Sequence, residues 1–241
     1  MQSSLYVTLS AQVALENRMT SIASNVANMN TAGFRAEEVK FDSFLSKAAS
    51  DPVAFASSGK NYITRQAGPV SYTGNSLDVA VSGNAWLGIQ TPGGMVYTRD
   101  GRMKVSEIGE LQTVAGHPVL DPGGAGIIVD PNAGPVAIAR DGAISQNGVQ
   151  VGGLGLFEIG DDAHLERWEN SGVKPDRPVV PVVDFVKNGV EQGYVEGSNV
   201  NPVMEMTRLI TVTRAFEQMA NSTQTAERSL QDAIQQLGKV S

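Results

Sequence analysis

The fold is decided by residues 201–238, whose sequence is NPVMEMTRLITVTRAFEQMANSTQTAERSLQDAIQQLG. Asn201 is a favourable helix N-cap, and Pro202 stands at the first helical position, where proline is tolerated best. Apolar or small residues then recur in alternating steps of three and four, which is the spacing of a helix seam: Leu209, Val212, Phe216, Met219, Thr223, Ala226, Leu230, Ala233 and Leu237. We therefore predict a helix from Pro202 to Leu237, about 54 Å long at 1.5 Å per residue.

A second helix is predicted at the other end of the chain, where residues 3–28 contain neither glycine nor proline. The same spacing places one face at Leu15, Met19, Ile22, Val26 and Met29. Asn28, Asn30 and Gly33 then supply the signals that end a helix. Because isolated amphipathic helices are marginal in water, we expect the two ends to pair as a coiled coil and to pack against other subunits.

The middle of the chain has the pattern of short strands. Leu77, Val79 and Val81 alternate with Asp78 and Ala80, as in a half-buried strand. Turn sequences such as Asp-Gly and Asn-Gly then follow at a spacing near ten residues. We expect a mixed α and β protein in which a central all-β domain, sandwich or barrel-like, is inserted between N- and C-terminal amphipathic helices. The expected divisions are the N-terminal helix (1–31), an extended connecting segment (32–74), the β-domain (75–186), a return linker (187–200) and the C-terminal long helix (201–241).

Composition limits the possible functions of the 241-residue chain. Its formal charge of −7 argues against nucleic acid as a partner, and the absence of cysteine excludes disulfides and thiolate metal sites. No stretch approaches the roughly 20 apolar residues of a membrane-spanning helix, so no membrane insertion is expected. Residues 1–28 also lack the pattern of a secretory signal peptide. His117 and His164 lie in polar or turn sequences, and we predict no catalytic residue, no metal and no cofactor.

Two motifs near opposite ends carry a family resemblance. Residues 24–35, SNVANMNTAGFR, resemble the N-terminal signature A-N-N-L-A-N-x-N-T-x-G-F of flagellar rod and hook proteins. Residues 197–206, GSNVNPVMEM, resemble their C-terminal signature G-S-N-V-N-P-V-x-E-M, and residues 214–217, RAFE, continue that match. Residues 72–81, YTGNSLDVAV, are similar to the entry into the β-domain of these proteins. Ser24 and Ala32 depart from the common pattern, which has Asn and Pro there.

The resemblance implies a structural subunit of the bacterial flagellar basal-body rod and not an enzyme. Such subunits polymerise through terminal helices, which are disordered in the free monomer, into a helical tube that transmits torque. The implied partners are the chain itself, other flagellar axial subunits (proximal and distal rod proteins) and the flagellar export apparatus. The implied location is the basal body, spanning the periplasm, after export without a cleaved signal peptide. The length and the turn Gly116-His117-Pro118-Val119 most resemble the proximal rod proteins.

The predicted assembly interface lies in the two motifs and along the C-terminal seam. Asn25 and Asn28 are expected to form hydrogen bonds between subunits or to cap the first helix. Gly33 is expected in a backbone conformation closed to other residues, and Phe34 in an intersubunit groove or a local core. The full set is Asn25, Val26, Asn28, Asn30, Thr31, Gly33, Phe34, Asn199, Asn201, Pro202, Leu209, Val212, Phe216, Met219, Leu230 and Leu237.

Two alternative functions remain open at this stage. One is a distal rod or hook-type axial subunit. The other is a soluble β-domain binding module, for instance for sugar, that oligomerises through a coiled coil. Protease-sensitive ends around a resistant core near residues 75–186 would favour the rod subunit, because a stable coiled coil would protect the C-terminal helix.

Overall fold

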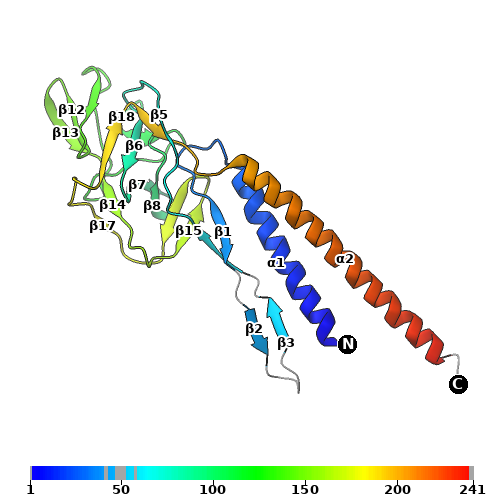
Figure 1. The fold of residues 1–241 in the computed structure, drawn as a ribbon. Coiled ribbons are helices and arrows are strands. Elements are labelled where there is room, and N and C mark those ends of the chain that lie inside the picture. The colour runs from blue at the N-terminus through cyan, green and yellow to red at the C-terminus, as the bar shows by residue number, and fades with distance from the viewer. Residues whose placement is uncertain (1, 41–42, 47–52, 57–58, 239–241) are drawn as a thin grey trace. The chain divides into compact units, whose positions relative to one another are not determined.

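The chain folds into two compact units, which are described separately. The computed structural model describes residues 2–40, 43–46, 53–56 and 59–238 (Figure 1). Unit 1 comprises Met1–Ala27, Glu37–Tyr62 and Asn201–Ser241, and unit 2 comprises Asn28–Ala36 and Ile63–Val200. Each unit is therefore assembled from segments that are far apart in the sequence.

Unit 1 is built on the two terminal helices, α1 (Gln2–Ala27) and α2 (Pro202–Gly238). They pack against each other and run antiparallel, with both chain termini at the same end of the pair (Figure 1). Two short strand pairs accompany the helices: β1 (Glu37–Lys40) with β4 (Lys60–Ile63), and β2 (Ser43–Ser46) with β3 (Val53–Ala56), of which the second is antiparallel. The helices predicted at both ends of the chain are confirmed.

Unit 2 is rich in β-structure, as predicted. Its largest sheet has six strands in the order β15-β16-β8-β7-β14-β17: Leu165–Trp168, Gly172–Pro175, Gly94–Thr98, Ala85–Thr91, Leu156–Glu158 and Val180–Pro181. A three-stranded sheet follows the order β11-β12-β13: Val136–Ile138, Ala143–Gln146 and Val149–Gly153. Both sheets are antiparallel throughout.

Three antiparallel strand pairs complete unit 2. They are β9 (Met103–Val105) with β10 (Leu111–Thr113), β18 (Gly189–Gln192) with β6 (Val79–Ser82), and β19 (Tyr194–Glu196) with β5 (Val70–Tyr72). No barrel closes among the described strands, because the six-stranded sheet ends at β15 on one side and β17 on the other. The barrel-like alternative is therefore not the observed architecture.

The central strands β7, β8 and β14 of the six-stranded sheet bury side chains on both faces, which explains their mainly apolar sequences. Side chains alternate between the faces of a strand. Leu87 and Leu156 accordingly lie in one core cluster, whereas Trp86, Tyr97 and Phe157 lie in a second. The rings of Tyr97 and Phe157 pack edge to face with centroids 5.4 Å apart. This two-sided core makes unit 2 a body of its own.

The segments predicted to connect the helices to the β-domain also contain strands. Strands β4 and β5 fall within residues 32–74, and strands β18 and β19 fall within residues 187–200. Because β18 pairs with β6 and β19 with β5, residues at both edges of the predicted β-domain are bonded into unit 2. The compact unit thus extends beyond residues 75–186.

Candidate assembly surface

On the two helices of unit 1, the described side chains at the predicted seam positions are buried or half-buried. Val212 of α2 is 3% exposed, and Leu209, Phe216 and Met219 are half-buried. On α1, Ile22 is 4% exposed and Val26 is half-buried. The positions of Leu230 and Leu237 belong to α2, but their side chains lie outside the described part of the structure.

Beside this seam lies an apolar groove of about 560 Å³. Its walls are residues of both helices: Ala11, Ala14, Leu15 and Arg18 from α1, and Ala215, Gln218, Met219 and Ser222 from α2. Small side chains on facing helices leave this space, because alanine fills little of the distance between two helix axes. The groove can therefore accept apolar side chains from outside the unit.

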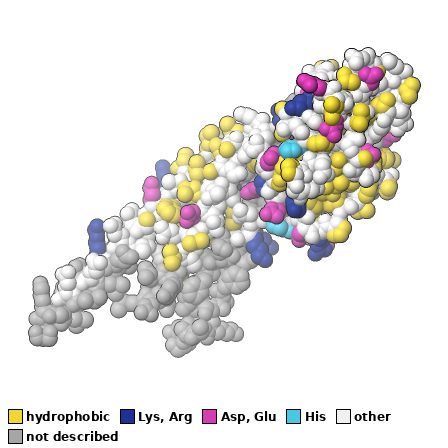
Figure 2. Space-filling model, turned by 180° about the vertical axis from the view of Figure 1, so that it is seen from behind, with side chains coloured by type: hydrophobic (Ala, Val, Ile, Leu, Met, Phe, Trp, Pro, Cys, Tyr) yellow, Lys and Arg dark blue, Asp and Glu magenta, His cyan; other side chains and the backbone are white. Residues whose placement is uncertain are grey.

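Both helices also present apolar side chains to solvent. Leu9 and Val13 of α1 are 55% and 40% exposed. On α2, Val203, Met206 and Ile210 are 73%, 49% and 55% exposed. Figure 2, which views the molecule from behind, shows hydrophobic side chains at the surface of this helical region. Clustered exposed apolar side chains of this kind mark protein–protein contact surfaces.

Asn25 is an internal tie within unit 1. The side chain is 1% exposed, its Nδ2 donates to the carbonyl oxygen of Glu37 at 2.9 Å, and its Oδ1 accepts from the Glu37 amide at 2.8 Å. Nδ2 also lies 3.4 Å from Oε2 of buried Glu205, whose Oε1 accepts a 2.6 Å bond from Arg208. All of these bonds lie within one chain, so Asn25 holds the start of β1 beside α1.

Residues 28–35 of the N-terminal motif belong to unit 2 and form a tight turn there. The Thr31 amide donates to the carbonyl oxygen of Asn28, and the Thr31 hydroxyl donates to Asn28 Oδ1, both at 3.1 Å. Asn30 is exposed. Gly33 has a φ of +67°, and a Cβ there would lie 2.2 Å from the backbone nitrogen of Asp100. The predicted backbone role of Gly33 is confirmed: both its conformation and its surroundings require glycine.

Phe34 is fully buried in unit 2, and the guanidinium of Arg167 lies 4.4 Å from its ring centroid. Arg167 also donates to the carbonyl oxygen of Arg35. Of the two predicted environments for Phe34, the structure has the local core.

A buried cluster of charges next to Phe34 was not predicted from the sequence. Glu196 is 1% exposed and lies between Arg35 at 2.7 Å and Arg99 at 2.9 Å, each of which is 2% exposed. Both guanidinium groups lie 5.8 Å from the ring centroid of Trp86. Burial lowers the pKa of Arg35 to about 10, against the attraction of Glu196, and it also lowers the pKa of Arg99.

The C-terminal motif supplies two further asparagines with separate tasks. In unit 2, Asn199 Oδ1 accepts from the Ala36 amide at 2.7 Å, and its Nδ2 donates to Thr64 Oγ1 and to the Gln66 carbonyl at 2.8 Å each. In unit 1, Asn201 Oδ1 accepts from the Met204 amide at 3.2 Å, which is the predicted N-cap of α2. Pro202 is the first residue of the helix and is exposed.

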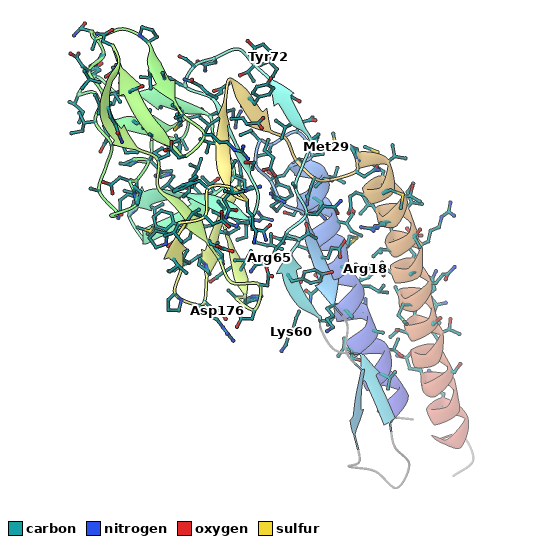
Figure 3. The ribbon with its side chains drawn as sticks, turned by 60° about the vertical axis from the view of Figure 1, so that its left-hand side comes forward. Arg18, Met29, Lys60, Arg65, Tyr72 and Asp176 are labelled. Carbon is teal, nitrogen blue, oxygen red and sulfur yellow. The ribbon has the colours of Figure 1, made fainter. Side chains whose placement is uncertain are left out.

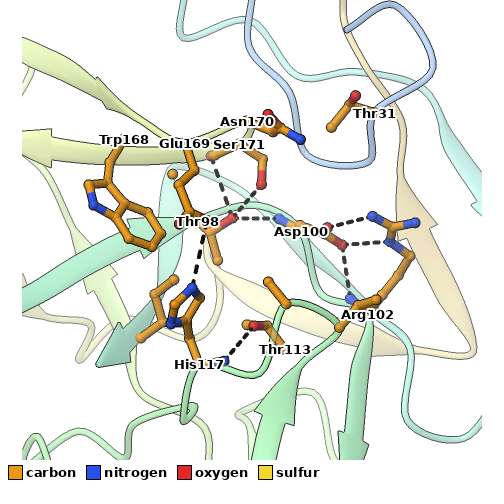
Figure 4. Close-up of a pocket in the computed structure, with 14 residues that line it drawn as sticks. Thr31, Thr98, Asp100, Arg102, Thr113, His117, Trp168, Glu169, Asn170 and Ser171 are labelled. Carbon is orange, nitrogen blue, oxygen red and sulfur yellow. Dashed lines mark hydrogen bonds and ion pairs between the residues drawn. The ribbon is translucent and has the colours of Figure 1, made fainter. Parts of the chain in front are cut away.

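Unit 2 also contains a polar pocket of about 250 Å³ (Figure 4). His117 packs on the ring of Trp168 with centroids 5.0 Å apart, and its Nε2 lies 3.6 Å from a carboxylate oxygen of Glu169. On another wall, Ser171 Oγ lies 3.2 Å from Thr98 Oγ1. The imidazole thus pairs with a carboxylate and the two hydroxyls pair with each other, which is not the arrangement of a nucleophile with its base.

Metal-binding clusters and membrane-spanning helices are both absent from the residues that the structure describes. In the ranges that the structure describes, no group of histidine and acidic side chains has the geometry to hold a metal ion. Among the same residues, no helix is both long enough and apolar enough to cross a membrane.

The fold is that of a subunit with a β-rich unit and two terminal helices that expose apolar side chains. Three family models match the chain: "Flagella basal body rod protein" at residues 5–35, "Flagellar hook protein FlgE/F/G D1 domain" at 80–146, and "Flagellar basal body rod FlgEFG protein C-terminal" at 191–236. Among curated proteins, flagellar basal-body rod protein FlgF of Mesorhizobium japonicum is 51% identical, over 100% of both chains. FlgF of Rhizobium meliloti is 47% identical over 99% of both chains, and FlgG of Bacillus subtilis is 28% identical over 97% of this chain and 98% of its own. The chain therefore belongs to the flagellar basal-body rod protein family and is a structural subunit of the basal-body rod.

Proposed function

We propose that the subunit polymerises through α1 and α2 into a helical tube that transmits torque. The observation that carries this proposal is the uncovered apolar surface of unit 1: a groove on one side of the helix pair and exposed apolar side chains on others. Burial of apolar surface contributes roughly 25 cal/mol per Å², so neighbouring copies that cover these side chains stabilise one another. Contacts between different faces that do not close into a ring generate a helical polymer.

Within the rod, we propose the proximal position. The support is that the FlgF relatives of Mesorhizobium japonicum and Rhizobium meliloti are 51% and 47% identical to the chain, whereas the FlgG relative of Bacillus subtilis is 28% identical. The alternative is a distal position. Immunolabelling of isolated basal bodies distinguishes the two: label at the end of the rod nearest the cell supports the proposal, and label at the hook-side end overturns it.

The proposed partners are further copies of the chain, other axial subunits and the flagellar export apparatus, with a location spanning the periplasm. The predicted coiled coil between the chain ends is part of this proposal, since its seam would continue into neighbouring subunits. The proposal involves no catalysis. It assigns the interface to Val26, Leu209, Phe216, Met219, Leu230 and Leu237 together with the exposed apolar side chains of both helices.

The decisive test is a charge in the half-buried seam. In a strain that lacks the chromosomal copy, we expect Phe216→Asp to abolish swimming and rod assembly, because a carboxylate cannot be buried against a neighbouring helix without a partner. Thr225→Asp, at an exposed position of the same helix, is the matched control. Normal rods from the Phe216→Asp protein, produced at the wild-type level, would overturn the proposal.

A further inference from the structure

Helix α1 carries an exposed ridge on the side opposite to the groove. Leu9 and Val13 are 55% and 40% exposed, and Glu16 on the next turn is also exposed. With 3.6 residues per turn, successive side chains are about 100° apart, so these three project within about 60° of one another. Arg18, which is labelled on α1 in Figure 3, lines the groove. At about 100° per residue it projects about 180° from Leu9. One helix thus presents a ridge and a groove wall in opposite directions.

The ridge and the groove have complementary charges. Arg18 is the charged residue of the groove lining, and Glu16 is the charged residue of the ridge. The two are separated by two positions, so they face different directions on one helix and cannot pair within a chain. Among the described residues, neither side chain has an ion pair.

The ridge and the groove also have the same length along α1. Leu9 and Glu16 are seven positions apart, and so are Ala11 and Arg18 in the groove wall. Seven residues of helix span about 10 Å. The groove lining includes three alanines, Ala11, Ala14 and Ala215, whose small side chains leave room for a leucine and a valine.

We propose that the ridge Leu9-Val13-Glu16 of one copy occupies the groove of a second copy, with Glu16 paired to Arg18. The inference rests on the proposed polymerisation and names the contact that propagates it. Because the ridge and the groove lie on opposite sides of α1, each added copy leaves its own ridge or groove available to the next copy. Such a contact between different surfaces repeats from copy to copy, and it gives a helical polymer when its rotation does not close into a ring.

The exposed side chains of α2 are the competing occupant. Val203, Met206 and Ile210 also face away from the groove, but the next acidic residue on that side of α2 is Glu217. It stands seven residues after Ile210, about 10 Å further along the helix. Among the described side chains of the two helices, two exposed apolar groups and an exposed carboxylate share one face within the length of the groove only on α1.

A charge exchange tests the pairing in full-length protein expressed in a strain that lacks it. Glu16→Arg and Arg18→Glu place like charges in the contact, which costs several kcal/mol, and each is expected to lower rod yield about tenfold or more. The double variant restores the opposite charges and is expected to recover rod yield to within about twofold of the wild type. Glu217→Arg is the control and is expected to assemble normally. Immunoblots of each variant check its level, and electron microscopy of isolated basal bodies measures rod yield.

Three results would overturn the pairing: normal rods from either single variant, a double variant no better than the singles, or rescue of Arg18→Glu by Glu217→Arg instead. A partner other than a second copy of this chain gives the second of these results. If Phe216→Asp still prevents rod assembly, none of these three results contradicts the proposed polymerisation through the terminal helices. Normal rods from Phe216→Asp as well would remove the polymerisation through these helices itself.

Discussion

Replacing Glu196 by glutamine should strongly destabilise unit 2, although it changes few atoms. Glu196 is 1% exposed and its two carboxylate oxygens lie 2.7 Å and 2.9 Å from the guanidinium groups of Arg35 and Arg99. Oε1 also accepts from the Gly68 amide at 3.1 Å. Glutamine keeps the size and part of the hydrogen bonding but removes the charge that both cations share.

The expected loss of stability comes from the two arginines, which remain buried without the charge of Glu196. Breaking a buried ion pair by removing one partner costs about 3–5 kcal/mol, because it leaves an uncompensated buried charge, and here two arginines lose the same partner. In a chain of this size each kcal/mol lowers the melting temperature by about 2–4 °C, so Glu196→Gln should melt roughly 6–20 °C below the wild type. The exposed pair of Asp162 and Arg177 offers a matched control. Asp162→Asn should cost no more than about 1 kcal/mol, because exposed ion pairs are screened by solvent.

Thermal and urea unfolding of the full chain, followed by tryptophan fluorescence, measure the effect directly. Trp86 lies beside the cluster, with its ring centroid 5.8 Å from each guanidinium, and reports on it. If Glu196→Gln and Asp162→Asn unfold at the same temperature, the cluster does not stabilise unit 2 and the reasoning from burial is refuted.

Three further predictions concern single positions. Gly33→Ala should destabilise the fold by several kcal/mol or prevent folding, because its Cβ would lie 2.2 Å from a backbone nitrogen. Gly148→Ala, at a position with positive φ but open space, should cost about 1 kcal/mol in urea unfolding. Equal losses of stability in the two variants would contradict the steric argument. Asn25→Ala leaves a buried amide hydrogen and a carbonyl unpaired and should lower the free energy of unfolding, followed by the helical signal in circular dichroism, by about 1–3 kcal/mol. Exposed Asn30→Ala should change it by no more than about 0.5 kcal/mol. Equal losses in the two variants would show that the hydrogen bonds of Asn25 carry no stability. Burial lowers the pKa of Arg35 from 12.5 to about 10, so between these values the unfolded chain binds more protons than the folded chain. The unfolding free energy of the wild type should therefore rise relative to that of Arg35→Met from about pH 9 to pH 11. A constant difference between the two in urea unfolding across that range would contradict this prediction.

The elements at the chain ends could be predicted because their signals are local. The three–four spacing from Leu209 onwards and the cap at Asn201 are read within single turns of a helix, and α2 begins at Pro202 as expected. The Asn147-Gly148 turn is equally local: both residues have positive φ and join β12 to β13.

The charge cluster could not be predicted because its members are distant in sequence. Arg35, Arg99 and Glu196 come from three separate segments, and charged residues are almost never fully buried unless they pair. The one available hint is position: Arg35 ends the N-terminal motif and Glu196 immediately precedes the C-terminal motif. The same limit applies to β4 and β5, since each forms only with a partner strand from another part of the chain. For β5 that partner, β19, lies more than a hundred residues away. Asn25 illustrates a third limit, because a helix pattern gives the face of an asparagine but not the strand that it binds.

Hydrogen exchange followed by mass spectrometry, on the purified free chain and on isolated rods, tests the central claim most directly. If neighbouring copies cover the helix pair, amides of residues 7–26 and 203–225 exchange far more slowly in rods than in the free chain, while strands β7 and β8 are protected equally in both. Equal exchange of the two helices in the free chain and in rods would contradict the account, because their apolar faces would then gain no cover from assembly.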